Sequence, residues 1–405
     1  MKRPGSNFGP VQPEFPSTQS EKTSVDCHEN RNLLGLPLLE DHFGVGKAGC
    51  MHDQEQTAPF RPPPLKIGPL VVDPPLVLAP MAGVTDSVYR WIMAEHGVGL
   101  VFTEMVSAQG LLRGNRESVR LCRQDLPLPG PLSVQIFGGD VDVVGRAAAS
   151  LEALGASAVD INAGCPVRKV LRQGAGAGLL QKPDLLARMV EKVKRSVRIP
   201  TTVKIRLDWT QSYSATVNLA KRLESAGADA ITLHGRTPAQ QFRGDADWTA
   251  IEQVKKSLGI PLIGNGDITR PSQADRVLRE GKCDGVMIGR GSLGNPWLLS
   301  TIVSRWRSPV QRNPHPGWED FFRTVHDHVR AFREKWPHCM GRLRTLLMYY
   351  SKGFPDTCRL RARLSTADGW DVLLSAFDSW MEDIARRGWA FLPFKIPELK
   401  KGEEP

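Results

Sequence analysis

An apolar strand that runs directly into a glycine turn with one cysteine is predicted by the residues Ala158-Val159-Asp160-Ile161-Asn162-Ala163-Gly164-Cys165-Pro166. Enzymes built from alternating strands and helices place catalytic groups on such turns, because loops at the carboxyl ends of strands stand on a rigid scaffold. The alternative for a lone cysteine is a small buried hydrophobic residue. The position of Cys165 on a glycine turn at the end of a strand favours a catalytic role.

Seven other short apolar runs also end in polar or glycine-marked turns, which makes eight predicted strands. The seven lie at residues 76–79, 100–103, 132–134, 201–203, 230–233, 261–263 and 285–288. Between most of them are helix-length segments with apolar residues three and four positions apart, such as 143–154, 185–197 and 215–226. This alternation over about 240 residues predicts an α/β fold with a closed (β/α)8 TIM barrel.

Glycine turns before three of the strands support this assignment. Gly155, Gly227 and Gly281 each follow a predicted helix and are the expected helix stops. The alternative is an open, doubly wound sheet. It is disfavoured because no Gly-x-Gly-x-x-Gly opens the first strand–helix turn.

The chain has 405 residues, more than one barrel requires, so we expect further parts. We predict a disordered N-terminal extension at 1–65, a catalytic barrel at 66–308, and a small helical domain with a short tail at 309–405. The first 65 residues are rich in Pro, Gly, Ser, Thr and charge and show no sustained periodicity. Neither a secretory signal nor a membrane-spanning run of about 18 apolar residues is found, so we expect a cytoplasmic protein.

The cysteine content and the net charge restrict the kinds of site and partner that we expect. The seven cysteines are scattered, without Cys-x-x-Cys pairs or His/Cys clusters, so we expect neither a disulfide framework nor a metal site. The net charge of +10 and the pI near 9.4 indicate an anionic partner.

Much of the excess positive charge lies between residues 323 and 363. The basic residues there are Arg323, Arg330, Arg333, Lys335, Arg342, Arg344, Lys352, Arg359, Arg361 and Arg363. Such an excess on helices indicates contact with a phosphate backbone, and the alternative is a solvated helix face. Aromatic residues interleaved with it can form a small helical core.

Six motifs in order resemble one known family. They are Ala79-Pro80-Met81-Ala82-Gly83-Val84-Thr85-Asp86, Asn162-Ala163-Gly164-Cys165-Pro166, Val203-Lys204-Ile205-Arg206, Leu233-His234-Gly235-Arg236-Thr237, Gly264-Asn265-Gly266-Asp267-Ile268 and Met287-Ile288-Gly289-Arg290-Gly291. Residues 76–303 closely resemble the tRNA-dihydrouridine synthases, and residues 66–390 resemble their bacterial B-type subfamily. The resemblance implies an FMN-containing barrel, a helical domain that holds tRNA, and NADPH as the reductant; we expect a monomer.

The resemblance also implies the reaction, which is reduction of the C5–C6 double bond of specific tRNA uridines to 5,6-dihydrouridine. FMN would give a hydride to C6, and Cys165 would give a proton to C5. A thiol with a pKa near 8.5 is mostly protonated at neutral pH and can still release its proton, which suits a general acid.

For FMN, the resemblance implies contacts from Pro80, Met81, Ala82, Gln135, Lys204, His234, Asn265, Gly266, Asp267, Gly289 and Arg290. Lys204 would stabilise negative charge on the N1–C2 edge of the reduced flavin, the alternative being a solvated lysine. The two glycine loops after the seventh and eighth strands would hold the phosphate. His234 is either a cofactor contact or a structural residue, and Glu104 and Arg236 would act only indirectly.

For substrate binding, the sequence leaves the roles of several residues open. Asn162 binds the uracil or holds the turn, and Arg206 touches the substrate or braces a loop. The segment 168–180 is either a mobile cover or a plain loop. Because a stacked uridine cannot reach a barrel mouth, its base must be extruded. Phosphates would be held by Arg359, Arg361 and Arg363, together with Arg113, Arg116, Arg168, Lys169 and Arg172.

Three other functions remain possible on the sequence alone. A flavin barrel acting on a free pyrimidine, akin to dihydroorotate dehydrogenases, leaves the basic helices unexplained. A barrel synthase without flavin leaves Cys165 and Lys204 without roles. A protein that only binds RNA would need no acid. Which uridine is modified, whether NADPH or NADH is preferred, and what residues 1–65 do are not encoded in any motif.

Overall fold

The computed structural model describes residues 60–307 and 317–388. The predicted disordered extension, apart from its last six residues, lies outside the described residues, as does the predicted C-terminal tail. The barrel and the C-terminal helices belong to one compact unit of the chain. The residue limits proposed above for the domains stay predictions.

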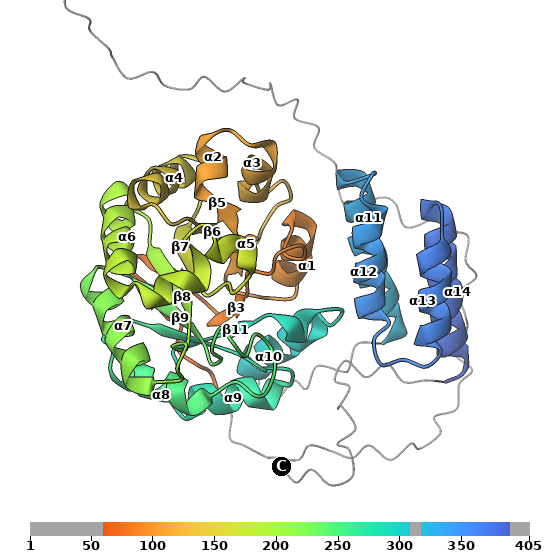
Figure 1. Ribbon diagram of the computed structural model, residues 1–405. Helices are drawn as coiled ribbons and strands as arrows, with labels where there is room; N and C mark the ends of the chain where they lie inside the picture. Colours follow the sequence, from red (N-terminus) through yellow and green to blue (C-terminus); the bar gives the residue numbers. More distant parts are fainter. Residues whose placement is uncertain (1–59, 308–316, 389–405) are drawn as a thin grey trace, which may run out of the picture. The chain divides into compact units, whose positions relative to one another are not determined.

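All eight predicted strands are present and form a ring of parallel strands (Figure 1). They are β3 (Leu76–Leu78), β4 (Val101–Phe102), β6 (Leu132–Phe137), β7 (Ala158–Ala163), β8 (Thr201–Arg206), β9 (Ala230–His234), β10 (Leu262–Asn265) and β11 (Gly285–Ile288). Their order in the sheet is β3-β11-β10-β9-β8-β7-β6-β4. A parallel bridge between Val77 and Leu100 joins the two ends of this order, so the sheet is a barrel and the open-sheet alternative is excluded.

Helices cover the outside of the ring (Figure 1). They are α1 (Ser87–Glu95), α2 (Ala108–Leu112), α3 (Arg116–Cys122), α4 (Val141–Ala153), α6 (Pro183–Ser196), α7 (Tyr213–Ser225), α8 (Trp248–Lys256), α9 (Pro271–Arg279) and α10 (Trp297–Arg307). The short helix α5 (Arg168–Leu171) instead lies in the loop after β7. The three helices predicted from periodicity correspond to α4, α6 and α7. The expected stops after α4 and α7 are confirmed, since Gly155 and Gly227 have φ of 86° and 96°, which only glycine adopts readily.

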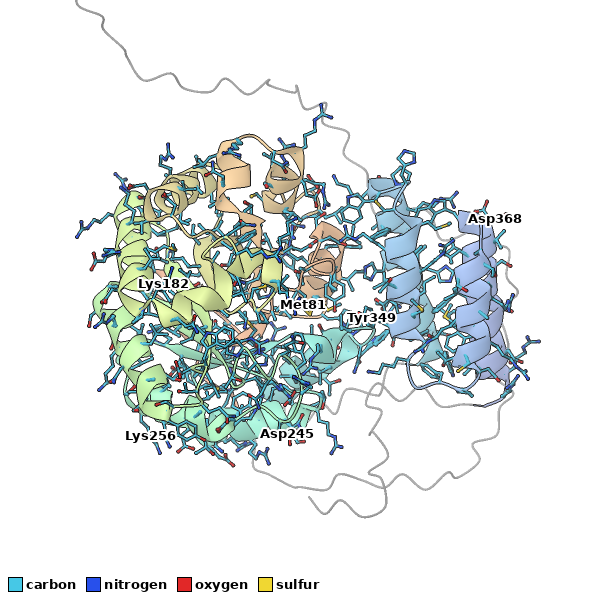
Figure 2. The ribbon with its side chains drawn as sticks, viewed as in Figure 1. Met81, Lys182, Asp245, Lys256, Tyr349 and Asp368 are labelled. Atoms are coloured by element: carbon cyan, nitrogen blue, oxygen red, sulfur yellow. The ribbon has the colours of Figure 1, made fainter. Side chains whose placement is uncertain are left out.

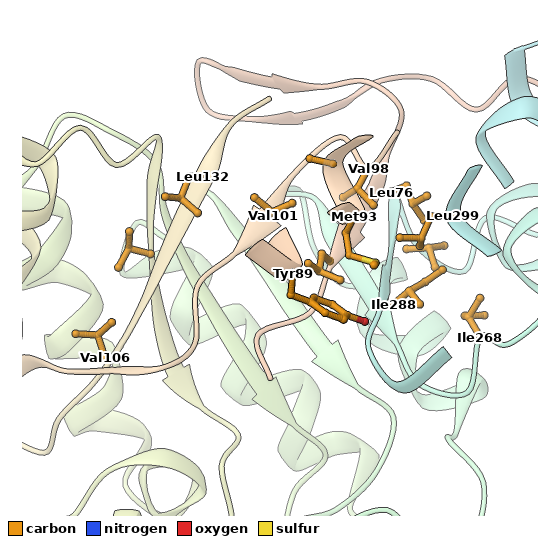
Figure 3. Packing of buried hydrophobic residues seen from close by; sticks show 14 of the residues in the cluster. Leu76, Tyr89, Met93, Val98, Val101, Val106, Leu132, Ile268, Ile288 and Leu299 are labelled. Atoms are coloured by element: carbon orange, nitrogen blue, oxygen red, sulfur yellow. The ribbon is translucent and has the colours of Figure 1, made fainter. Parts of the chain in front are cut away.

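The main apolar core lies between the strands and these helices. Figure 3 shows part of it, including Met93 of α1, Leu299 of α10 and the strand residues Leu76 and Ile288. All four are fully buried or nearly so. Burial of each such side chain contributes about 1.5–3 kcal/mol, so the strand ends that carry the polar site residues are held rigidly.

A hairpin that we did not predict closes the barrel at the amino ends of its strands. Strands β1 (Leu65–Ile67) and β2 (Leu70–Val72) pair antiparallel, and Leu65 and Ile67 are buried. Leu65 packs against Gly285, where β11 begins. A short strand β5 (Val106–Ser107) was also not predicted. The hairpin seals the amino ends of the strands and leaves the carboxyl ends for chemistry.

Four helices follow the barrel: α11 (Trp318–Lys335), α12 (Met340–Tyr350), α13 (Thr357–Thr366) and α14 (Trp370–Arg386). The expectation that their aromatic residues form a core is confirmed, because Phe321, Phe332 and Tyr350 are buried. Phe321 also stacks on Trp297 of α10, with ring centroids 5.5 Å apart, so the helices share packing with the barrel. None of the described helices is both long and apolar enough to cross a bilayer.

Candidate active site

The predicted site residues gather at the carboxyl ends of four neighbouring strands. Asn162 of β7 is the cross-strand neighbour of Lys204 on β8, and Arg206 two residues further on is the neighbour of His234 on β9. His234 in turn lies beside Asn265 on β10. Alternate residues of a strand share one face, so these polar side chains converge at one rim of the barrel.

The turn that carries Cys165 is held from two sides. The side-chain oxygen of Asn162 accepts hydrogen bonds from the backbone N–H groups of Gly164, at 3.2 Å, and of Cys165, at 3.0 Å. The backbone N–H of Ala177 donates to the carbonyl of Cys165 at 2.9 Å. Of the two roles expected for Asn162, holding the turn is therefore present.

The thiol of Cys165 is a free, half-buried group. Burial raises its pKa, and this effect exceeds the opposing effects of a backbone hydrogen bond from Val167 and the positive charge of Arg206. The thiol is therefore protonated at neutral pH, the state that a proton donor needs.

The segment 168–180 divides into two parts. Residues 175–177 are buried, and the indole N–H of Trp209 donates to the carbonyl of Ala177 at 3.0 Å. Gly176 has φ of 60°, and a Cβ there would lie 2.5 Å from the carbonyl oxygen of Cys165. This part is packed under the cysteine turn and does not lie open over it. The exposed residues are Arg168, Lys169, Arg172 and Gln173.

Lys204 is fixed by Asn265. Its ammonium group donates to the Asn265 side-chain oxygen at 3.0 Å, and the Asn265 amide N–H groups donate to the carbonyl of Met287 at 2.8 Å. Burial lowers the pKa of Lys204 to about 7, with a further lowering by the charge of Arg206 and an opposing effect of Asp160. The charge of Lys204 thus responds to any anion placed beside it at neutral pH.

Four cations surround His234, which is itself buried. Burial lowers the pKa of its imidazole, and the charges of Lys204, Arg206, Arg236 and Arg290 lower it further, so the ring is neutral. One guanidinium N–H group of Arg236 lies 3.4 Å from Nε2 of His234. Because a guanidinium only donates, Nε2 is the acceptor and the ring proton is on Nδ1.

The glycine loop after β10 is built around Asp267. Its carboxylate accepts from the guanidinium of Arg236 at 2.6 Å, from the backbone N–H of Ala246 at 2.7 Å, and from Arg290 at 3.2 Å. Gly266 before it has φ of 139°, and a Cβ there would lie 2.4 Å from the Cβ of Ala246. Only glycine fits this position.

Arg206 has a bracing role and belongs to an aromatic contact that we did not predict. Its guanidinium donates to the carbonyls of Thr237, at 3.2 Å, and of Gln241, at 2.7 Å. It also lies over the ring of Phe242, at 5.5 Å, and Arg290 lies over the same ring at 4.6 Å. The Phe242 side chain is 56% exposed. A single phenylalanine in a polar loop gave no periodic signal.

The loop after β3 carries Pro80, Met81 and Ala82, with Met81 labelled in Figure 2. The loop is turned by Thr85, whose hydroxyl accepts from the backbone N–H of Met81 at 3.0 Å. Pro80 and Met81 are half-buried and Ala82 is exposed. These residues are thus open to a ligand at the rim.

Two buried carboxylates and an arginine of the C-terminal helices also support this loop. Glu104 accepts a hydrogen bond from the backbone N–H of Gly83, and Asp86 caps the start of α1 through the N–H groups of Val88 and Tyr89. The guanidinium of Arg342, on α12, lies 3.0 Å from Asp86 and 3.4 Å from Glu104. The expectation that Glu104 acts indirectly agrees with this arrangement.

Gln135 faces a carboxylate that we did not predict. Its amide N–H group donates to Asp160 at 2.6 Å, and its oxygen accepts from the Asn162 amide at 2.8 Å. The other oxygen of Asp160 accepts from the hydroxyl of Thr202 at 2.6 Å. Burial raises the pKa of Asp160 to about 6, although the two hydrogen bonds and Lys204 oppose this. The sequence did contain a signal for Asp160, namely a charged residue inside an otherwise apolar strand.

The basic residues of the C-terminal helices divide into two classes. Five of the ten between residues 323 and 363 form salt bridges, namely Arg323, Arg330, Arg333, Lys335 and Arg342. By contrast, Arg359, Arg361 and Arg363 of α13 are exposed and form no salt bridge with any residue of 60–307 or 317–388. Helix α13 therefore carries three exposed cations that no salt bridge to a described residue neutralises.

Comparison with known proteins gives consistent matches. The family model described as dihydrouridine synthase matches residues 77–379. A protein named probable tRNA-dihydrouridine synthase from Rickettsia bellii is 34% identical over 74% of this chain and 93% of its own length. A tRNA-dihydrouridine synthase B from Pasteurella multocida is 42% identical over 59% of this chain and 72% of its own. The probable tRNA-dihydrouridine synthase 1 of Synechocystis is 37% identical over 78% of this chain and 90% of its own length.

Proposed function

Because the chain belongs to the dihydrouridine synthase family, we propose that it reduces the C5–C6 double bond of specific tRNA uridines to 5,6-dihydrouridine, using FMN and NADPH. In the balanced reaction, uridine, NADPH and a proton give dihydrouridine and NADP⁺. The observation that carries the proposal is the arrangement at the rim, where the protonated thiol of Cys165 lies near Arg206, and Arg206 in turn lies near the partly buried Lys204.

The rim carries side chains that suit an anionic cofactor such as FMN. Lys204, Arg206, Arg236 and Arg290 gather there around His234, whose pKa is lowered first by burial and further by these four charges. In the loop after β11, Gly289 and Gly291 are partly exposed, and a Cβ at Gly289 would lie 3.3 Å from the Cβ of Ala79. A phosphate group is expected to meet Arg290 and the loops after β10 and β11, because backbone N–H groups and a guanidinium both bind phosphate.

When bound, FMN supplies the hydride for C6, after its own reduction by NADPH. Pro80, Met81 and Ala82 would line one side of its ring system. Lys204 would stabilise negative charge on the flavin because it is already oriented by Asn265 and needs no rearrangement. Cys165 would donate the proton to C5 from a turn that Asn162 holds in place.

We assign the tRNA contact to α13 and to exposed basic residues near the rim. Arg359, Arg361 and Arg363 are the exposed cations of α13, and Arg113 and Arg116 are exposed after β4. Arg168, Lys169 and Arg172 are exposed next to the cysteine turn. A base extruded from the tRNA would reach Cys165 between these groups.

The reaction is tested by incubating the full chain with FMN, NADPH and tRNA that lacks dihydrouridine, with free uridine in a parallel sample. The proposal predicts dihydrouridine in tRNA and NADPH oxidation that depends on tRNA. NADPH oxidation with free uridine but not with tRNA would instead assign the barrel to a free pyrimidine. A protein that binds no FMN would overturn the proposal altogether.

The tRNA contact is tested by charge reversal at Arg359, Arg361 and Arg363. Tight binding to a phosphate backbone releases counterions, and each lost contact lowers the slope of log affinity against log salt by about 0.7–0.9. The triple variant should therefore show a slope about 2–3 smaller and an unchanged FMN content. The control reverses three exposed basic residues of α6 and α7: Arg188, Arg195 and Lys221. Equal slopes in both variants would refute the assignment.

A further inference from the structure

A row of three polar side chains crosses the barrel interior below the reactive rim. Gln135, Asp160 and Thr202 are cross-strand neighbours on β6, β7 and β8. All three are almost completely buried, with 1%, 0% and 2% of their surface exposed. The proposed reaction gives Asp160 no role, and yet burying a carboxylate is costly unless it is fully hydrogen-bonded.

The row continues upward to the cysteine turn as a chain of hydrogen bonds. The Gln135 amide donates to Asp160 at 2.6 Å and accepts from the Asn162 amide at 2.8 Å. The Asn162 oxygen accepts from the backbone N–H groups of Gly164 and Cys165. The chain thus links a buried carboxylate to the residue proposed as the proton donor.

The two ends of this chain fix its direction. An ionised carboxylate only accepts hydrogen bonds, so Asp160 requires the N–H group of Gln135. Backbone N–H groups only donate, so the turn requires the oxygen of Asn162. Both requirements lead to the same orientation of the two side-chain amides, with Asn162 donating to Gln135 between them.

The direction determines what Asn162 can offer a ligand. A side-chain amide oxygen has two lone pairs, and both are used by the turn. One amide N–H is used by Gln135. For the other, the nearest partner within 60–307 and 317–388 is the sulfur of Met105, a weak acceptor 4.0 Å away. Asn162 can therefore donate to a ligand but cannot accept from it.

We propose that Asp160 is a positioning residue that acts through Gln135 to orient Asn162, so that the site offers an N–H group to the pyrimidine and selects a carbonyl over an amino group. Uracil carries two carbonyls on its ring, whereas cytosine has an amino group in place of one of them. An amino group facing Asn162 would set two donors against each other. This proposal rests on the proposed function, because it assigns the pyrimidine to the same site.

A simpler role for Asp160 is as a counter-ion of Lys204, which lies close enough to lower its pKa. That role depends on charge alone, whereas orientation depends on which atoms donate and accept. A pair of substitutions separates the two, because the negative charge can be moved from position 160 to position 162, whose cross-strand neighbour is Lys204.

The first variant is Asn162→Asp. Its carboxylate can still accept from the turn, but its second oxygen faces the Gln135 oxygen. Rotating the Gln135 amide only moves the conflict, because its oxygen then faces Asp160. Two acceptors meet in either orientation, and apoprotein stability should fall.

The second variant combines Asp160→Asn with Asn162→Asp. The whole chain can then run in reverse: residue 160 accepts from Thr202 and donates to Gln135, and Gln135 donates to residue 162. Every group is paired and the net charge is unchanged. The control combines Thr202→Val with Asn162→Asp, which alters a hydrogen bond to the same carboxylate but leaves Asp160 unable to donate.

The readouts are the urea midpoint of each apoprotein and dihydrouridine formation, both at pH 8, where a carboxyl with a pKa of about 6 is ionised. We expect the reversed double variant to regain at least half of the midpoint lost in Asn162→Asp, and the control to regain none. The reversed variant should also form dihydrouridine at least 100-fold more slowly at saturating tRNA, since residue 162 then carries no N–H group.

A reversed double variant no more stable than Asn162→Asp would overturn the orienting role of Asp160. Recovered stability with a wild-type rate of reduction would overturn the selection of a carbonyl by Asn162. If the wild-type protein forms no dihydrouridine, the proposed function fails, whereas the comparison of midpoints still decides whether Asp160 orients the amides.

Discussion

Binding of FMN to the apoprotein at pH 8 is expected to take up close to one proton, with Lys204 as the group that takes it. The pKa of Lys204 in the apoprotein is about 7, so about a tenth of the molecules carry the charge at pH 8. An anionic group beside the ammonium would return the pKa toward the ordinary value of 10.5, at which the lysine is almost fully charged. The uptake is then about 0.9 proton.

Other titratable groups at the rim contribute little to the proton uptake at pH 8. Burial raises the pKa of Cys165 and lowers that of His234, so at pH 8 the thiol stays protonated and the imidazole stays neutral. Arg206 has a pKa lowered to about 10 and stays charged, and Asp160, with a pKa of about 6, stays ionised. A phosphate monoester with a second pKa near 6 is already a dianion.

Titration calorimetry in two buffers of different ionisation enthalpy measures the uptake. The wild-type protein should take up about 0.9 proton at pH 8, Lys204→Met close to none, and the exposed control Lys221→Met the same as wild type. Because binding consumes a proton, wild-type affinity should also fall as pH rises above about 7, and Lys204→Met should lose this dependence. Equal uptake by Lys204→Met and wild type would refute the reasoning.

Two further substitutions test the contacts that hold the loops at the rim in place. Arg342→Met leaves two buried carboxylates without their cation, so the free energy of unfolding should fall by about 2–3 kcal/mol at pH 8 in urea denaturation, after a discount for the partial exposure of the arginine. The loss should shrink at pH 5, because the pKa of Asp86 is raised to about 6 and its neutral form needs no cation; a loss equal to that of the exposed Arg330→Met would contradict this. Gly266→Ala should weaken FMN binding at least tenfold in a flavin fluorescence titration, because its φ is 139° and its Cβ would lie 2.4 Å from that of Ala246, and unchanged affinity would show that this loop does not hold the cofactor.

The barrel was predictable because buried parallel strands are apolar along their whole length. The run 285–288 is an example, and it ends where the glycine loop with Arg290 begins. The hairpin β1–β2 was missed because three-residue strands are too short for their alternation to stand out. Local sequence thus predicts long, buried elements and misses short ones that depend on what they cover.

The site was predictable where function lies at a strand end and not where it depends on contacts across strands. Cys165 and Lys204 were predicted by position and by resemblance. Asp160 was missed because its partners lie 25 and 42 residues away in the chain. The salt bridges of the basic stretch could not be predicted for a similar reason, since Arg333 and Lys335 are paired with Asp371 and Asp125, which lie far from them in sequence.

The role proposed for Cys165 is that of the proton donor in the reduction of uridine in tRNA. It is tested most directly by nucleoside mass spectrometry after incubating tRNA that lacks dihydrouridine with FMN, NADPH and protein in D₂O. Wild type and the control Cys339→Ala should form dihydrouridine that carries solvent deuterium at C5, and Cys165→Ala should form dihydrouridine at least 100-fold more slowly while still binding FMN. If Cys165→Ala forms dihydrouridine at the wild-type rate, Cys165 is not the proton donor.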